Sequence, residues 1–173
     1  LKNVDHIPPD EASNTPSPDE KEQAKLYGVR IKTDREFALA SASLRQALQD
    51  MPEMTELSKH IIFEETQKGL NLEIVDQDGR SMFAEGSRQP YERTRMLIRK
   101  LAAPLRQSPL RVAIVGHTSS NFASPRPGYD AFDLSADRAN TVRQILEQEG
   151  LPSTHIFSVS GKADSEPLFP DDP

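Results

Sequence analysis

Two short apolar runs on either side of an amphipathic segment limit most strongly how this chain can fold. The first run, LRVAIVGHT at 110–118, has a glycine near its end, which is typical of a buried strand that leads into a loop. The segment LSADRANTVRQIL follows with apolar residues at helical spacing, and THIFSVSG at 154–161 is the second run. Strand, helix and strand in this order favour helices packed on one sheet, with right-handed crossovers where strands are parallel.

The residues before this unit predict a hairpin and further helices. Residues 60–75 alternate apolar and polar side chains on both sides of Gly69, as two half-buried strands joined by a turn do. The sequence DQDG at 76–79 is a second turn signal. Apolar spacing predicts three helices: one capped by Asp34, one between Pro52 and Lys59, and one that starts near Pro90.

The first 28 residues differ in composition from the rest of the chain. They contain four prolines, many acidic residues and few large apolar ones, so they cannot bury enough surface to offset the cost of ordering. We therefore predict a disordered tether at 1–28, a helical linker at 29–59 and a folded domain at 60–173. The expected fold is an α/β (α+β) two-layer sandwich, with helices packed on one mixed β-sheet. Because the chain begins at Leu1, we expect a fragment of a longer protein.

Charge and composition exclude several classes of function. The net charge is -6 and no block of lysine and arginine stands out, which argues against nucleic-acid binding. The absence of cysteine excludes disulfides and thiolate metal sites. The four histidines share no metal-ligand spacing, GHTSS lacks the GxSxG pattern, and SVSGKADS lacks the full phosphate-binding loop pattern. We therefore predict no enzymatic activity, no metal and no cofactor.

The loop at 118–131 and the helix after it hold the candidate binding residues. Asp133 or Ser135 is expected to cap this helix, which places Arg138 in its first turn. A cation is disfavoured there by the partial positive charge of the helix end, so Arg138 is interpreted as a group that binds an anion. The alternative is a surface salt bridge with Asp133 or a glutamate. Under the first interpretation, replacing Arg138 weakens binding and leaves the stability of the fold nearly unchanged.

These segments resemble a known family. RVAIVGHT, LSADRANTVRQIL and GLPSTHIFSVSGKADSEPL look like the peptidoglycan-binding domain of outer-membrane protein A. More narrowly, GLNLEIVDQDGRSMFAEGS and YDAFDLSADRAN are similar to the flagellar motor stator B subunits (MotB). The resemblance covers about residues 60–170. It implies an OmpA-like fold, a periplasmic location and a missing last strand, so that the domain is truncated at its C-terminus.

The resemblance also implies a ligand, which is the diaminopimelate of the peptidoglycan stem peptide. The family arginine that binds a carboxylate of this ligand corresponds to Arg138. The family aspartate corresponds to Ser119 and the family asparagine to Ala131, so we expect weak binding of the ligand's ammonium group unless Asp130 or Asp133 substitutes. The candidate ligand-binding residues are Arg138, Thr118, Ser119, His117, Asp133 and Asp130.

The function implied is a non-covalent anchor that holds a flagellar stator against the cell wall. The implied partners are peptidoglycan, a second copy of the chain, and the stator A subunit through a membrane helix expected upstream; nucleic acid is not among them. One alternative is a protein-interaction or dimerisation module that has lost peptidoglycan binding, which Ser119 and Ala131 suggest. Another is a general envelope anchor unrelated to motility, and a hydrolase is a distant third.

Overall fold

The computed structural model describes residues 18–75, 81–118 and 124–165 of the chain. The chain divides into two units, Leu1–Ala38 and Leu39–Pro173. The elements follow one another as α2 (Pro18–Gln49), α3 (Met54–Leu57), β1 (Ile61–Thr66), β2 (Gly69–Ile74), α4 (Glu92–Gln107), β3 (Val112–Gly116), α5 (Ala131–Gln148), the 3₁₀ helix η1 (Ser153–His155) and β4 (Ile156–Gly161).

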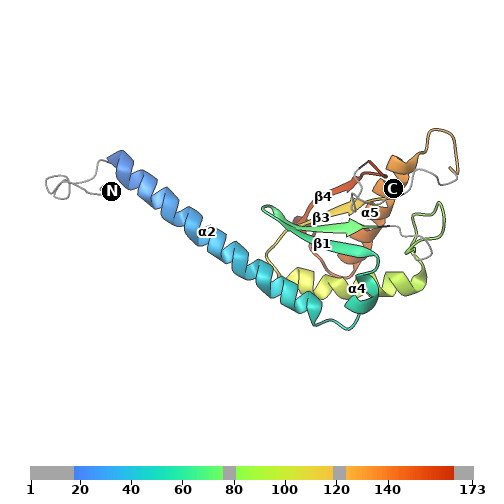
Figure 1. The fold of residues 1–173 in the computed structure, drawn as a ribbon, viewed down its shortest axis with the longest axis horizontal. Coiled ribbons are helices and arrows are strands. Elements are labelled where there is room, and N and C mark those ends of the chain that lie inside the picture. Colours follow the sequence, from blue (N-terminus) through green and yellow to red (C-terminus); the bar gives the residue numbers. More distant parts are fainter. Residues whose placement is uncertain (1–17, 76–80, 119–123, 166–173) are drawn as a thin grey trace, which may run out of the picture. The chain divides into compact units, whose positions relative to one another are not determined.

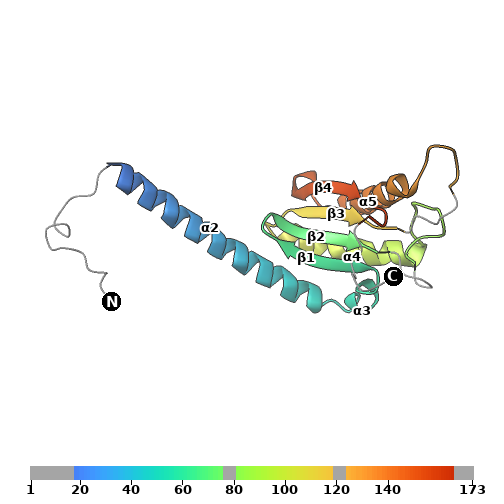
Figure 2. The same cartoon turned by 45° about the horizontal axis from the view of Figure 1, so that its top comes forward.

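The four strands form one mixed sheet in the order β1-β2-β3-β4. β1 and β2 are antiparallel, whereas β2, β3 and β4 run parallel to one another. The strands lie side by side, with α4 and α5 on one face of the sheet (Figures 1 and 2). The predicted class, helices packed on one mixed sheet, is confirmed, as are the predicted hairpin and both apolar strands.

The core lies between this sheet and the apolar faces of α4 and α5. Each helix carries its buried residues at intervals of three and four, the spacing that places them along one face. The most buried members of the core are Leu72, Ile74, Ile98, Leu101, Leu105, Ile114, Leu134, Val142, Ile145 and Leu146. The apolar faces predicted for these two helices are therefore confirmed. The predicted DQDG turn lies outside the described residues.

The start of α2 differs from the prediction. Residues 1–17 of the predicted tether lie outside the described residues, but the chain is helical from Pro18 rather than from Asp34. The segment DEKEQAKL, which follows Pro18, consists largely of strong helix formers, and proline is favourable in the first turn of a helix. The helix therefore includes residues 18–28 of the predicted tether, because strong helix formers are concentrated near the end of that segment.

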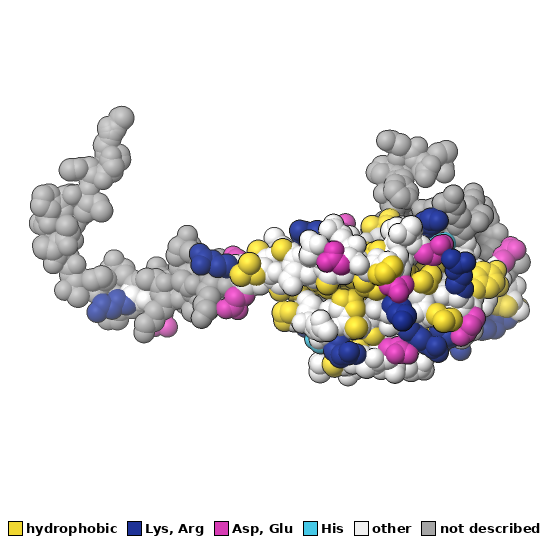
Figure 3. Space-filling model, turned by 90° about the horizontal axis from the view of Figure 1, so that it is seen from below, with side chains coloured by type: hydrophobic (Ala, Val, Ile, Leu, Met, Phe, Trp, Pro, Cys, Tyr) yellow, Lys and Arg dark blue, Asp and Glu magenta, His cyan; other side chains and the backbone are white. Residues whose placement is uncertain are grey.

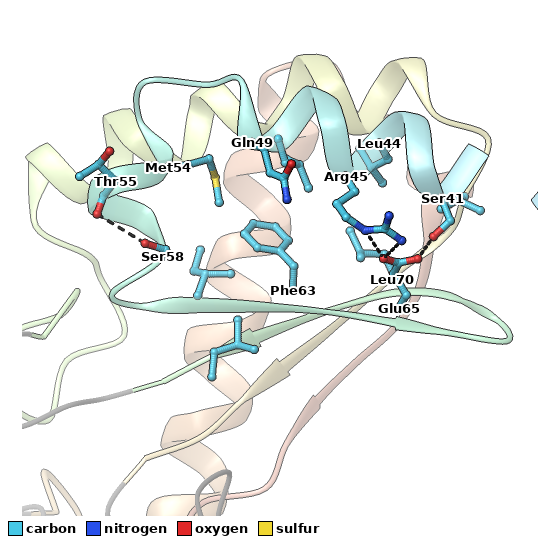
Figure 4. Close-up of a pocket in the computed structure, with 14 residues that line it drawn as sticks. Ser41, Leu44, Arg45, Gln49, Met54, Thr55, Ser58, Phe63, Glu65 and Leu70 are labelled. Atoms are coloured by element: carbon cyan, nitrogen blue, oxygen red, sulfur yellow. Dashed lines mark hydrogen bonds and ion pairs between the residues drawn. The ribbon is translucent and has the colours of Figure 1, made fainter. Parts of the chain in front are cut away.

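The last turns of α2 pack on β1. Leu44 and Leu48 are buried. Figure 4 shows Ser41 and Arg45 converging on Glu65 of β1. The Nε of Arg45 donates to Oε1 of Glu65 over 2.8 Å, and the hydroxyl of Ser41 donates to the other carboxylate oxygen. These contacts hold the end of the helix against the edge strand of the described sheet.

The surface carries charges of both signs. On the rounded part of the molecule in Figure 3, acidic and basic side chains lie interspersed with apolar ones. Ion pairs join Arg93 to Glu56 and Arg99 to Glu149. No helix in the described part of the chain combines the length and the apolarity that crossing a bilayer requires.

Candidate functional site

The candidate site begins where β3 ends. The backbone N–H of His117 donates to the carbonyl oxygen of Ile74 over 2.9 Å, and that of Thr118 donates to the carbonyl oxygen of Ala163 over 3.0 Å. Both residues are buried. The start of the loop is therefore held between the end of β2 and the segment that follows β4. Ser119, which the sequence places next in the site, lies outside the described residues.

His117 contacts a carboxylate that sequence reasoning missed. Its Nε2 lies 2.5 Å from Oε1 of Glu73, and both side chains are about nine-tenths buried, at 10% and 9% exposed. Glu73 lies opposite Val115 in the register of β2 and β3. Residues two apart on a strand share a face, so Val115, His117 and Glu73 meet on the same side of the sheet. This alternation along the two strands is the sequence signal that Glu73 and His117 share a face of the sheet. The contact orients the imidazole of His117.

The N-terminus of α5 is closed by a capping box. The N-cap is Asp130, whose carboxylate accepts from the N–H of Asp133 over 3.1 Å, while the carboxylate of Asp133 accepts from the N–H of Asp130 over 2.9 Å. The predicted cap at Asp133 or Ser135 is therefore wrong. Arg138 lies beyond the first turn, and the argument from the helix dipole does not apply to it. The two carboxylates that are candidates for the ligand's ammonium each accept one backbone hydrogen bond here.

Arg138 is a buried residue that joins α5 to the segment before α4. Its side chain lies against Phe83, with Cζ 4.6 Å from the ring centroid, and the residue is 3% exposed. Its Nε donates to the carbonyl oxygen of Ser87 over 2.7 Å, and Nη2 donates to that of Ala84 over 3.2 Å. The guanidinium is therefore held in one orientation. These contacts also change the expectation for stability, because removing Arg138 takes a partner from each of these two carbonyl oxygens.

Two glycines bring the strand ends against α5. A Cβ added to Gly116 would lie 2.1 Å from the carbonyl oxygen of Ser135, and one added to Gly161 would lie 2.2 Å from the backbone nitrogen of Ala136. Only glycine permits such a close approach. The hydroxyl of Ser135 also accepts from the N–H of Ala163 over 3.0 Å. Helix and strand ends thus form one rigid frame.

The loop before α5 has its own contacts, which sequence reasoning did not anticipate. The guanidinium of Arg126 stacks on Tyr129, with Cζ 4.3 Å from the ring centroid. The hydroxyl of Tyr129 donates to Oδ2 of Asp137 over 2.6 Å. Burial, and then the hydrogen bond and negative charge of Asp137, raise the pKa of Tyr129 to about 12. The phenol is therefore neutral at physiological pH and ties the loop to α5.

The structure brings the candidate residues together only in part. Among the described residues, no three histidine, aspartate or glutamate side chains gather as a metal site would require. The structure brings His117 and Thr118 to the end of β3, and it places Asp130, Asp133 and Arg138 on the neighbouring helix or at its cap. The loop that joins the two groups carries Arg126. Gly116 faces α5, so the side chain of His117, one residue later, is directed to the other face of the sheet, and Arg138 is buried.

The comparison with protein families decides the assignment. The model of the OmpA family matches residues 82–173, just over half of the chain. The chain belongs to the OmpA family. The match includes α4, β3, α5 and β4, and with them all six candidate ligand-binding residues.

This OmpA-family domain is similar to proteins of motility and of cell-wall anchoring. It is 36% identical over 121 residues to motility protein B of Escherichia coli K12, in an alignment that covers 69% of this chain and 39% of that protein. It therefore spans about two fifths of the length of that relative. A MotB-like protein from Desulfovibrio vulgaris shares the fold with a TM-score of 0.58 at 16% identity, over 81% of this chain and 85% of the other.

A third relative by fold is the cell wall anchor of the T6SS from Pseudomonas aeruginosa. Its TM-score is 0.52 at 20% identity, over 67% of this chain and 80% of the other. These relatives are a motility protein, a MotB-like protein and a cell wall anchor.

Proposed function

We propose that this OmpA-family domain is the periplasmic anchor of a flagellar motor stator, and that it binds peptidoglycan non-covalently. The observation that carries the proposal is the fixed guanidinium of Arg138, which lies on the helix that bears LSADRAN. Phe83 and two carbonyl oxygens from the segment before α4 orient it. A planar guanidinium matches a carboxylate, and the stem peptide of peptidoglycan supplies carboxylates through its diaminopimelate. Arg138 is the group toward which that carboxylate is directed.

The relatives support this role from two sides. The similarity to motility protein B covers most of the chain, and it connects the domain with the motor. The fold shared with a cell wall anchor shows that this architecture serves attachment to the wall in another protein. In the proposed role, an upstream membrane helix joins the domain to the stator A subunit in the inner membrane.

Cosedimentation with purified, insoluble peptidoglycan tests the proposal. The domain is expected in the pellet at low salt, and soluble diaminopimelate-containing tripeptide is expected to release it. The variant Arg138→Ala is expected to bind less. The charge-removing variant Arg143→Ala is its matched control, because Arg143 also lies on α5 but pairs with Glu147 over 2.9 Å. A domain that stays in the supernatant under all these conditions would contradict the proposal.

A groove beside α2 favours a second candidate function, the pairing of two copies. This groove has a volume of about 620 Å³ and opens between the end of α2, α3 and β1 (Figure 4). Its apolar lining includes Leu44, Leu48, Met54 and the half-buried Phe63. An apolar surface of this kind is suited to a protein contact.

Sedimentation velocity distinguishes this pairing from wall binding. Dimerisation that Phe63→Ser abolishes, and that Tyr91→Ser leaves intact, would assign the groove to the dimer, since Tyr91 is an exposed aromatic residue outside it. A monomer at high micromolar concentration would contradict pairing by this part of the chain.

A further inference from the structure

The loop before α5 presents an exposed cation that the structure fixes in place. Arg126 is exposed, and none of the ion pairs found among residues 18–75, 81–118 and 124–165 includes it. Its guanidinium nevertheless has a defined position, because it stacks on the ring of Tyr129. A stacked arginine keeps its N–H edge available for a planar anion.

Several contacts hold the loop around Arg126 in one conformation. The hydroxyl of Ser124 is within hydrogen-bond distance of two backbone oxygens, those of Arg126 at 2.7 Å and Tyr129 at 2.6 Å. Pro125 and Pro127 flank the arginine and restrict the backbone on both sides. The hydroxyl of Tyr129 then connects this unit to Asp137 on α5. A ligand that binds Arg126 therefore pays less of the entropy cost of ordering a loop.

The loop cation lies beside the proposed site and differs from Arg138 in exposure. Asp137, which anchors the loop, is the residue directly before Arg138 on α5. Arg138 is 3% exposed and donates to two backbone carbonyl oxygens, whereas Arg126 faces solvent. A ligand that approaches this end of α5 from solution thus meets the guanidinium of Arg126 on the surface. The exposed arginine is thus connected, through Tyr129 and Asp137, to the helix that carries the buried one.

We propose that Arg126 is a second ligand-binding residue, which pairs with the side-chain carboxylate of diaminopimelate in the stem peptide. This inference rests on the proposed function and adds a contact to it. The stem peptide carries more than one carboxylate, so two separate guanidinium groups have partners on one ligand. Asp130 and Asp133 each accept a backbone hydrogen bond through one carboxylate oxygen in the capping box. Arg126 supplies the contact that solvent can reach.

Calorimetric titration with the tripeptide L-Ala–γ-D-Glu–meso-diaminopimelate tests this contact. Arg126→Gln is expected to weaken binding about twofold to fivefold, as loss of one solvent-exposed charged pair does. Arg111→Gln is the matched control, because Arg111 is also exposed and also stacks on an aromatic ring, with Cζ 5.0 Å from the centroid of Phe157. Arg111 lies directly before β3, at the opposite end of that strand from His117, and its replacement should leave the affinity unchanged.

A second ligand identifies the group that Arg126 recognises. The second ligand is the same tripeptide with the side-chain carboxylate of diaminopimelate converted to an amide. Wild-type protein should lose affinity for the amidated tripeptide, whereas Arg126→Gln should bind both tripeptides equally. If the wild type binds and Arg126→Gln matches it for both ligands, the inference is overturned and the proposed function stands. If the wild type binds neither tripeptide nor insoluble peptidoglycan, both are overturned.

Discussion

Burial gives Arg138 a structural task in addition to any role in binding. Its guanidinium lies on Phe83 and donates to the carbonyl oxygens of Ala84 and Ser87. These contacts join α5 to the segment before α4, which are far apart in sequence. Removing Arg138 takes a charged donor from both carbonyl oxygens, although that of Ala84 still accepts from the N–H of Ser87, and it leaves a cavity where the buried side chain lay.

We therefore predict that Arg138→Ala lowers the free energy of unfolding by about 2–3 kcal/mol. Arg143→Ala should change it by about 0.5 kcal/mol or less, because a partly exposed pair on one helix contributes little. Urea unfolding followed by circular dichroism measures both values. Equal, small effects of the two variants would show that Arg138 is dispensable for the fold.

The anchoring of the loop by Tyr129 should weaken as the pH becomes strongly alkaline. Its pKa is raised to about 12, above the usual value of 10.0, so the folded state keeps the phenol protonated where the unfolded state loses its proton. This contribution to stability is complete below about pH 10 and is lost as the pH rises through about 12. The difference in unfolding free energy between wild type and Tyr129→Phe should shrink across that range. A difference that is constant from pH 8 to 12 would contradict this linkage.

At this scale the helix-dipole argument that points to Arg138 is wrong, and the role of Arg138 in binding stays a prediction. Arg138 was selected as a first-turn cation, but the capping box begins the helix at Ala131. The spacing of Asp130 and Asp133 was visible, yet Asp133 and Ser135 are acceptable caps as well, and only the fold selects among them. The contact between His117 and Glu73 joins residues on different strands. Alternation assigns each residue to a face of its strand, but the register that pairs β2 with β3 comes from the fold.

Elements meet most closely where α5 crosses the ends of β3 and β4. A methyl group on Gly116 would overlap the carbonyl oxygen of Ser135, and one on Gly161 would overlap the backbone of Ala136. Because these neighbours are backbone atoms, they cannot rotate away as a flexible side chain does.

Gly116→Ala and Gly161→Ala are each expected to destabilise the domain by about 1–3 kcal/mol or more, as overpacking does. Gly128→Ala is the comparison, because an added Cβ meets nothing within 4 Å there, and only the backbone angle φ of +80° opposes it. Its cost should be about 1 kcal/mol. Thermal unfolding of the three variants measures the difference. Tolerance of alanine at both Gly116 and Gly161 would contradict the close contact.

The elements themselves were largely predictable, and their beginnings were not. The period of two in 60–75 and the helical spacing after Pro90 record burial on one face, which the fold requires. The start of α2 at Pro18 depends on helix propensity in a segment whose prolines and acids suggested disorder. Composition averaged over 28 residues concealed the favourable residues near its end.

For the whole molecule, the division at Leu39 predicts which part of the chain folds alone. The second unit begins there and includes Leu44 and Leu48, which pack at the end of α2. A chain of residues 39–173 should keep the unfolding free energy of the complete chain to within about 0.5 kcal/mol. A chain that begins at Pro52 should lose about 3 kcal/mol or more, because it lacks both buried leucines.

Differential scanning calorimetry on the two shortened chains gives the comparison. Equal melting temperatures for both would mean that the end of α2 does not contribute to the second unit. Destabilisation of the 39–173 chain would instead mean that earlier residues are part of it.

The rigid frame around α5 has a consequence for redesign of the domain. Backbone atoms of the helix and of Gly116 and Gly161 touch without side chains between them, so α5 cannot shift to accommodate another ligand. The loop at 124–130 joins this frame at fixed points and owes its own shape to short-range contacts. New recognition is therefore obtained by grafting a different loop while the scaffold stays untouched, as antibody engineers do with hypervariable segments.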